Sequence, residues 1–123
     1  MKMKTKIFLL SLMIFVTFSC TKTAPVPVTY QATGAISGFN LNYTDANGDL
    51  IKIQVSPQSA QDVWKLSFTS EQGSIVYLSG KYNDPNSALK LMILVNGKVY
   101  KQAANEGDTI KYLTISGVVP YDE

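Results

Sequence analysis

Apolar side chains alternate with polar ones along most of the chain from Thr29 onward, and this period of two constrains the fold more than any other feature. Ile51, Ile53 and Val55 are separated by polar residues, and apolar positions recur at the same spacing within residues 89–95. Because successive side chains of a strand point to opposite faces of a sheet, such runs indicate strands that bury one face. Nothing shows helical spacing over a useful length. The chain is therefore predicted to be all-β.

Turn signals separate these runs at intervals of about eight to twelve residues, a spacing typical of sandwiches. Asn47-Gly48 and Asn96-Gly97 suit the positive φ angles of tight hairpins, and Pro57 ends a run because proline cannot donate to a ladder. The pattern predicts a single immunoglobulin-like antiparallel β-sandwich of seven to eight strands, with a closed barrel as the alternative. We expect Trp64 to be the bulkiest side chain that points into its core.

The first twenty residues predict where the protein is sent. Three lysines fall within the first six residues, residues 7–18 are almost wholly apolar, and Ser19 precedes Cys20, the only cysteine. The apolar run is too short to cross a bilayer core, which needs about twenty residues. The segment resembles a bacterial lipoprotein signal, so we expect residues 1–19 to be removed and Cys20 to carry the lipid that holds the protein to a membrane.

Two alternatives to lipid attachment follow from the same residues. Ser19 and Thr17 also satisfy an ordinary signal peptidase, which would leave Cys20 at the new N-terminus without lipid. An uncleaved membrane anchor is disfavoured by the length of the run. Thr21 stands where some lipoproteins have an aspartate that retains them at the inner membrane, which favours the outer membrane of a bacterial envelope.

The sequence divides after the signal into a tether and a domain. Residues 20–28 contain the lipidated cysteine and a Pro-rich stretch, in which Pro25 and Pro27 favour an extended path that rises about 3 Å per residue. Residues 29–123 are then expected to form the β-sandwich. Without a cysteine pair no disulfide can form, so the fold must rest on its apolar core.

The composition narrows the possible functions. Residues 20–123 hold eight lysines against nine acidic residues, dispersed along the chain, so there is no basic stripe for a phosphate backbone and nucleic acid is not an expected partner. The chain has no histidine, the commonest general base and metal ligand, and no arginine. We therefore expect a monomeric module that is not an enzyme, with no cofactor, no catalytic residues and no metal.

Two acidic motifs have plain alternatives. Residues 45–49 offer the alternating oxygens that begin a calcium loop, but Leu50 replaces the glycine and Ser56 replaces the glutamate of such loops, so a hairpin turn is favoured. Asp62 and Glu71 could form a carboxylate pair for acid and base chemistry, but they fall at opposite ends of one strand run. We interpret both as solvated loop charges.

The tyrosines are the better candidates for a contact surface. Tyr100 is expected on the same strand face as Lys98 and Gln102, and Tyr77 and Tyr112 are expected to be partly exposed. Aromatic side chains beside polar ones are frequent at protein interfaces, so Tyr100 is the candidate residue for contact with an envelope protein. The alternative is that these tyrosines cover the edge of the core as amphipathic side chains.

Several segments resemble one family. The apolar run, Asn-Gly turn and return run of residues 89–99, together with residues 28–34, 41–45 and 116–117, are similar in kind and order to MmpS-like proteins. The resemblance implies an anchored β-sandwich that serves as an accessory of large lipid and siderophore exporters. This chain differs in its lipid anchor and in lacking a cysteine pair. We expect an accessory module of an envelope transport complex, or else a structural or adhesion module that binds a surface polymer or protein.

Overall fold

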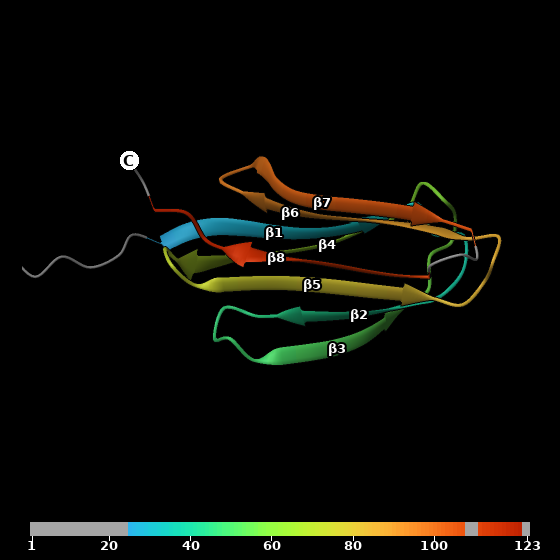
Figure 1. Cartoon of the computed structure of the whole chain (residues 1–123), viewed down its shortest axis with the longest axis horizontal. Coiled ribbons are helices and arrows are strands. Elements are labelled where there is room, and N and C mark those ends of the chain that lie inside the picture. The colour runs from blue at the N-terminus through green and yellow to red at the C-terminus, as the bar shows by residue number, and fades with distance from the viewer. Residues whose placement is uncertain (1–24, 108–110, 122–123) are drawn as a thin grey trace, which may run out of the picture.

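The computed structural model describes residues 25–107 and 111–121, and within them every regular element is a β-strand. Two four-stranded antiparallel sheets, in the orders β4-β1-β6-β7 and β3-β2-β5-β8, face each other (Figure 1). This confirms the predicted antiparallel β-sandwich. The described residues contain no helix long and apolar enough to span a membrane. The strands are β1 (Pro25–Thr33), β2 (Phe39–Thr44), β3 (Leu50–Val55), β4 (Val63–Glu71), β5 (Ile75–Tyr82), β6 (Ala88–Val95), β7 (Lys98–Glu106) and β8 (Tyr112–Val118).

The alternation of the sequence becomes the two sides of each sheet. On β2, Phe39, Leu41 and Tyr43 are buried while the residues between them face outward. On β6, the expected inward positions are buried as well. Each sheet therefore contributes one apolar face to a shared core, and burying that area supplies the main favourable term in folding. The core side chains that the structure describes include Val26, Val28, Tyr30, Leu78, Tyr82, Leu89, Leu91, Ile93, Ile115 and Val119.

Two tyrosines are among the core residues. Tyr30 and Tyr82 are the largest fully buried side chains among the described residues. Trp64 points inward as expected, but it is only half-buried, because β4 is an edge strand of its sheet. Its ring packs against the core through Tyr43, with ring centroids 5.6 Å apart. The bulkiest side chain therefore covers one edge of the core, and the two tyrosines are its largest fully buried members.

Tyr30 also joins the two sheets by hydrogen bonds. Its hydroxyl donates to the carbonyl oxygen of Thr44 at 2.8 Å and accepts from the backbone N–H of Tyr77 at 3.3 Å. These two groups belong to β2 and β5, beyond the last residues that pair the two strands. Its ring lies 5.1 Å from that of Phe68. Burial raises the pKa of the Tyr30 hydroxyl above its ordinary value, although the hydrogen bonds with the Thr44 side-chain hydroxyl and with the Tyr77 N–H act to lower it.

The start of β1 corrects the expected boundary between tether and domain. Residues 25–28 were expected in the tether of residues 20–28, but they form the first part of β1, and Val26 and Val28 are buried. Prolines are tolerated here because β1 pairs with β6 only from Val28 onward. Pro27 accepts a hydrogen bond from the N–H of Asn96 in the β6–β7 turn, so its nitrogen points past the end of β6 and no ladder bond is lost.

The two Asn-Gly turns differ. Asn96 and Gly97 have φ angles of 55° and 78° and join β6 to β7 as a two-residue hairpin, as predicted. Between β2 and β3 only Gly48 has a positive φ, and the turn takes the five residues 45–49. Its shape comes from Asp45, whose Oδ1 atom accepts from the backbone N–H groups of Asn47 and Asp49 at 2.9 and 3.0 Å.

Candidate functional site

Polar side chains form a broad surface on the outer side of the β3-β2-β5-β8 sheet. Antiparallel register places Asn40 between Gln54 and Lys81, and places Asn42 in the next row between Lys52 and Ser79. These side chains line a shallow hollow of about 440 Å³. On β8, Tyr112 and Thr114 extend the two rows. We call this surface the amide face, and it consists of Asn40, Asn42, Lys52, Gln54, Ser79, Lys81, Tyr112 and Thr114.

The amide face is rich in hydrogen-bonding groups that the protein does not use itself. Within the described part of the chain, the side chains of Asn40, Asn42 and Gln54 make no hydrogen bond, whereas Thr114 donates to Ser79 at 3.2 Å. Each amide can donate and accept at once, as a hydroxyl-bearing ligand requires. Lys52 and Lys81 form no ion pair with a described residue, and no carboxylate belongs to the amide face. The surface therefore suits a ligand that carries hydroxyl groups and some negative charge.

The sequence contained part of the signal for this surface. Asn40 and Asn42 occupy the polar half of the β2 alternation, so their shared outward face is predictable. Strand order is not predictable in the same way, because β2 and β5 are separated in the sequence by two strands of different sheets. Because strand order is not predictable, the sequence did not identify Lys81 as a candidate binding residue. The amide face exists only once β5 has placed that lysine beside Asn40.

Tyr100 lies at a different edge of the sandwich. It is half-buried, and its hydroxyl donates to the carbonyl of Val118 on β8 at 2.8 Å and accepts from the N–H of the same residue at 3.3 Å. Its ring lies over Gly117, where a Cβ atom would come within 2.7 Å of it. Tyr100 thus fastens β7 to β8 where the two sheets approach each other. Its contact with an envelope partner stays a prediction.

A β-bulge explains this position. Ile93 pairs with Lys101 and Leu94 pairs with Val99, so Tyr100 is one residue more than β6 can match. The period of two is broken at this point, and Gln102 faces outward while Tyr100 faces β8. The face expected to be shared by Tyr100 and Gln102 is therefore not formed.

The other tyrosines named from the sequence lie on the outer side of the β3-β2-β5-β8 sheet. Tyr112 is 64% exposed and stands opposite Lys81 at the end of the amide face. Tyr77 is half-buried and stands opposite Ser116. The partial exposure expected for both is thus observed. Cys20, the expected lipid attachment site, lies outside the described residues.

The acidic candidates do not converge. The Asp45 carboxylate is engaged by the backbone of its own turn, as described above. Asp62 accepts from the N–H of Gln58 at 2.6 Å in the loop before β4, and Glu71 ends the same strand. Across residues 25–107 and 111–121, no three His, Cys, Asp or Glu side chains come together as a metal site would need. The Asp45 and Asp62 carboxylates shape their own loops, and Glu71 is exposed at the end of β4.

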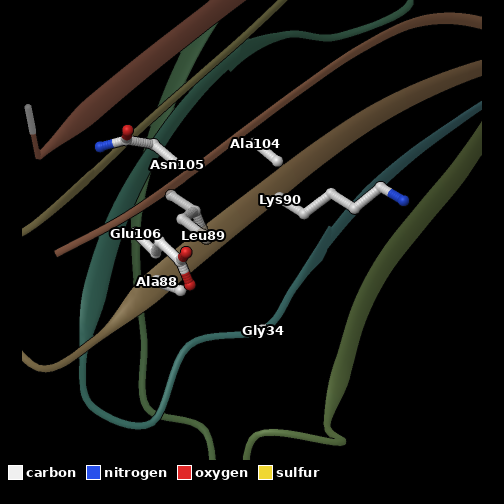
Figure 2. Close-up of a pocket in the computed structure, with 7 residues that line it drawn as sticks. All are labelled: Gly34, Ala88, Leu89, Lys90, Ala104, Asn105 and Glu106. Atoms are coloured by element: carbon white, nitrogen blue, oxygen red, sulfur yellow. The ribbon is translucent and has the colours of Figure 1, made fainter.

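A second hollow, of about 360 Å³, lies where β6 begins and β7 ends. Figure 2 shows it bounded by the small residues Gly34, Ala88 and Ala104, with the Lys90 side chain directed away from the Glu106 carboxylate. Asn105 donates to the hydroxyl of Tyr82 at 3.2 Å and is therefore occupied by the core. The remaining polar groups of this hollow are the separate charges of Lys90 and Glu106, without the aligned rows of amide side chains that make the amide face the better candidate site.

No family model matches the sequence, and no curated protein matches it. The resemblance to MmpS-like proteins therefore rests on the motifs of residues 28–34, 41–45, 89–99 and 116–117.

Proposed function

We propose that this protein is a non-enzymatic lipoprotein of the bacterial cell envelope that is anchored through Cys20 and binds a hydrophilic polymer of the envelope through the amide face. The observation that carries the binding role is the amide face itself: two rows of amide, hydroxyl and lysine side chains with no carboxylate among them. The anchoring role is supported by the signal-like residues 1–19 and the single cysteine that follows them. Thr21 supports placement in the outer membrane.

The shape of the amide face favours an extended ligand. Four strands spaced about 4.8 Å apart spread the rows over roughly 15 Å, which is a wide and open surface. Pockets for small molecules are instead concave and mostly apolar. A polymer can bind along the rows through many weak hydrogen bonds, and linked contacts of this kind reinforce one another. Lys52 and Lys81 favour a polymer that bears carboxylate or phosphate groups.

A protein partner from an envelope transport complex is the second candidate. One observation favours it: Tyr112 is 64% exposed at the border of the amide face, and Tyr77 is partly exposed on the same sheet. Tyrosine is enriched at protein interfaces because its ring buries a large area while its hydroxyl stays hydrogen-bonded. The accessory role implied by the resemblance to MmpS-like proteins would use such a contact.

Affinity electrophoresis in gels that contain a soluble polymer tests the first candidate. We expect polygalacturonate, which is anionic, to retard the protein more strongly than neutral dextran does. Replacing both Asn42 and Lys52 by alanine removes a paired amide and lysine from the amide face, and should weaken retardation roughly thirtyfold if each contact is worth about 1 kcal/mol.

The opposite sheet offers a matched control. Gln31 and Lys65 are also a paired amide and lysine, on the outer face of β1 and β4. Replacing both by alanine should leave the retardation unchanged. Equal losses in the two double variants would contradict the proposed site. If neither polymer retards the wild-type protein while Tyr112→Ala abolishes co-purification of an envelope protein, the second candidate is the correct one.

A further inference from the structure

The end of the sandwich at which β1 begins is also the end nearest to Cys20. Pro25 opens β1, so only residues 21–24 separate the sandwich from the cysteine. Strand directions place three turns at this end, those between β2 and β3, β4 and β5, and β6 and β7, together with the residues that follow β8 (Figure 1, left). We call this the anchor end.

The short link sets how far the anchor end can stand from a membrane. Five residue steps join Cys20 to Pro25, and an extended chain spans at most about 3.5 Å per step, which gives roughly 17 Å. The headgroup layer occupies about 5 to 8 Å of each bilayer leaflet. A lipid on Cys20 would therefore hold the anchor end within about 10 Å of the headgroups or against them.

The anchor end carries most of the large hydrophobic side chains that are exposed among the described residues. Ile75 and Val118 face each other across β5 and β8 and are 68% and 47% exposed, and Tyr121 is 64% exposed. We call these three residues the anchor-end patch. Of the eight large hydrophobic side chains that are exposed, five lie at this end and three at the other. The five are Leu50, Ile75, Val99, Val118 and Tyr121, and the three are Ile36, Val63 and Tyr112.

Backbone hydrogen bonds make the anchor-end patch a fixed surface. The N–H of Gly73 donates to Val119 at 2.9 Å, and the N–H of Val119 donates to Ser74 at 2.8 Å. These bonds join the β4–β5 turn to the residues after β8. Tyr121 lies directly over Gly73, where any Cβ atom would clash with its hydroxyl. The patch is thus held in place before any partner arrives, so binding costs little ordering of the chain.

We propose that the anchor-end patch rests on the headgroup layer of the membrane that holds Cys20, and that the lipid headgroups it contacts are zwitterionic. The inference rests on the lipid anchoring in the proposed function. Tyrosine and aliphatic side chains are favoured at the membrane interface. Because the lipid already confines the domain, a weak contact is enough to keep it docked. Asp45, Asp49 and Glu71 lie at the same end, which disfavours an anionic surface.

Docking by the anchor-end patch would also orient the amide face. Asn40, Gln54 and Lys81 lie near the opposite ends of their strands. With the anchor end on the membrane, the far ends of these strands stand farther from the bilayer than the anchor-end patch does. The row that contains Lys81 and Tyr112 then faces the aqueous side, where an envelope polymer can reach it.

Site-specific fluorescence in the processed full-length lipoprotein tests this contact. A lipid on Cys20 consumes the only native thiol, so an introduced cysteine is the single site for a dye. Val118→Cys reports on the anchor-end patch, and Val63→Cys, which is similarly exposed at the other end of the sandwich, is the matched control. In phosphatidylcholine vesicles, headgroup-labelled nitroxide lipid should quench the dye at residue 118 several-fold more strongly than the dye at residue 63.

Equal quenching at the two positions, with the protein still attached to the vesicles, would overturn the docking proposal and leave the anchoring intact. Labelling of Cys20 itself would show that no lipid is attached, and both proposals would then fail. If Val118→Cys does not fold, Ile75→Cys and Tyr112→Cys form a second matched pair, since these side chains are 68% and 64% exposed at opposite ends. Trp64 fluorescence verifies that each variant is folded.

Discussion

Tyr30→Phe removes one hydroxyl from the core and tests how much its hydrogen bonds between the two sheets stabilise the fold. The phenylalanine ring keeps the contacts of the native ring with Phe68, whereas the hydrogen bonds to Thr44 and from Tyr77 are lost. A typical hydrogen bond contributes about 1 kcal/mol, and a buried donor left without a partner costs about 1 to 3 kcal/mol. We therefore expect the free energy of unfolding to fall by about 2 to 3 kcal/mol.

Urea unfolding followed by Trp64 fluorescence measures this loss. The midpoint should fall while the m value stays unchanged, because the variant exposes the same surface on unfolding. Tm should fall on the order of 10 °C or more for a domain of this size. Tyr112→Phe is the control, since the Tyr112 hydroxyl makes no hydrogen bond with a described residue and its side chain is largely exposed. A loss in Tyr30→Phe no larger than in Tyr112→Phe would refute the bridging role of the hydroxyl.

The same hydroxyl gives the domain a pH dependence with a defined sign. Burial raises the pKa of folded Tyr30, so the unfolded chain loses this proton at a lower pH than the folded one. The stabilisation is complete below the unfolded pKa of about 10 and is lost as the pH rises through the higher folded pKa. The wild-type protein should therefore lose stability above about pH 10 more steeply than Tyr30→Phe does. Parallel curves for the two proteins would contradict this assignment.

Three further changes test the edges and the centre of the sandwich. Gly80→Ala places a Cβ atom 2.5 Å from Leu89, and overpacking of this kind should cost about 1 to 3 kcal/mol in urea unfolding; no loss would show that the sheets can move apart. Trp64→Ala should cost about 2 to 3 kcal/mol, less than a fully buried tryptophan, and a loss below about 1 kcal/mol would place the ring outside the core. Tyr100→Phe should lower the free energy of unfolding by about 1 kcal/mol, because it removes the hydrogen bonds to Val118. If Tyr100 serves only to join the strands, the variant should co-purify with an envelope partner as well as the wild-type protein does.

The sequence was sufficient for the features that depend on local pattern. The period of two predicts the buried positions of β2 and β6, and Asn96-Gly97 predicts the β6–β7 hairpin, because both depend only on neighbouring residues. It could not show that Pro27 belongs to a strand. Proline is tolerated there only because β6 has already ended at that level of the sheet.

Features that depend on strand order and register were beyond the sequence. The bulge that turns Tyr100 toward β8 becomes visible only when the pairing of β6 with β7 is known. The amide face likewise requires β5 to lie beside β2. Tyr30 could have been placed inward by its alternation, but its bond to Thr44 depends on how the two sheets stack.

The mass of the N-terminal peptide of the mature protein tests the central claim most directly, because the envelope location and the docking of the anchor end both depend on it. The account predicts a peptide that begins at Cys20, with a diacylglyceryl group on its sulfur and an acyl group on its amine. The protein should then fractionate with membranes until detergent releases it. A mature chain that begins with unmodified Cys20, or at any other residue, would contradict the account.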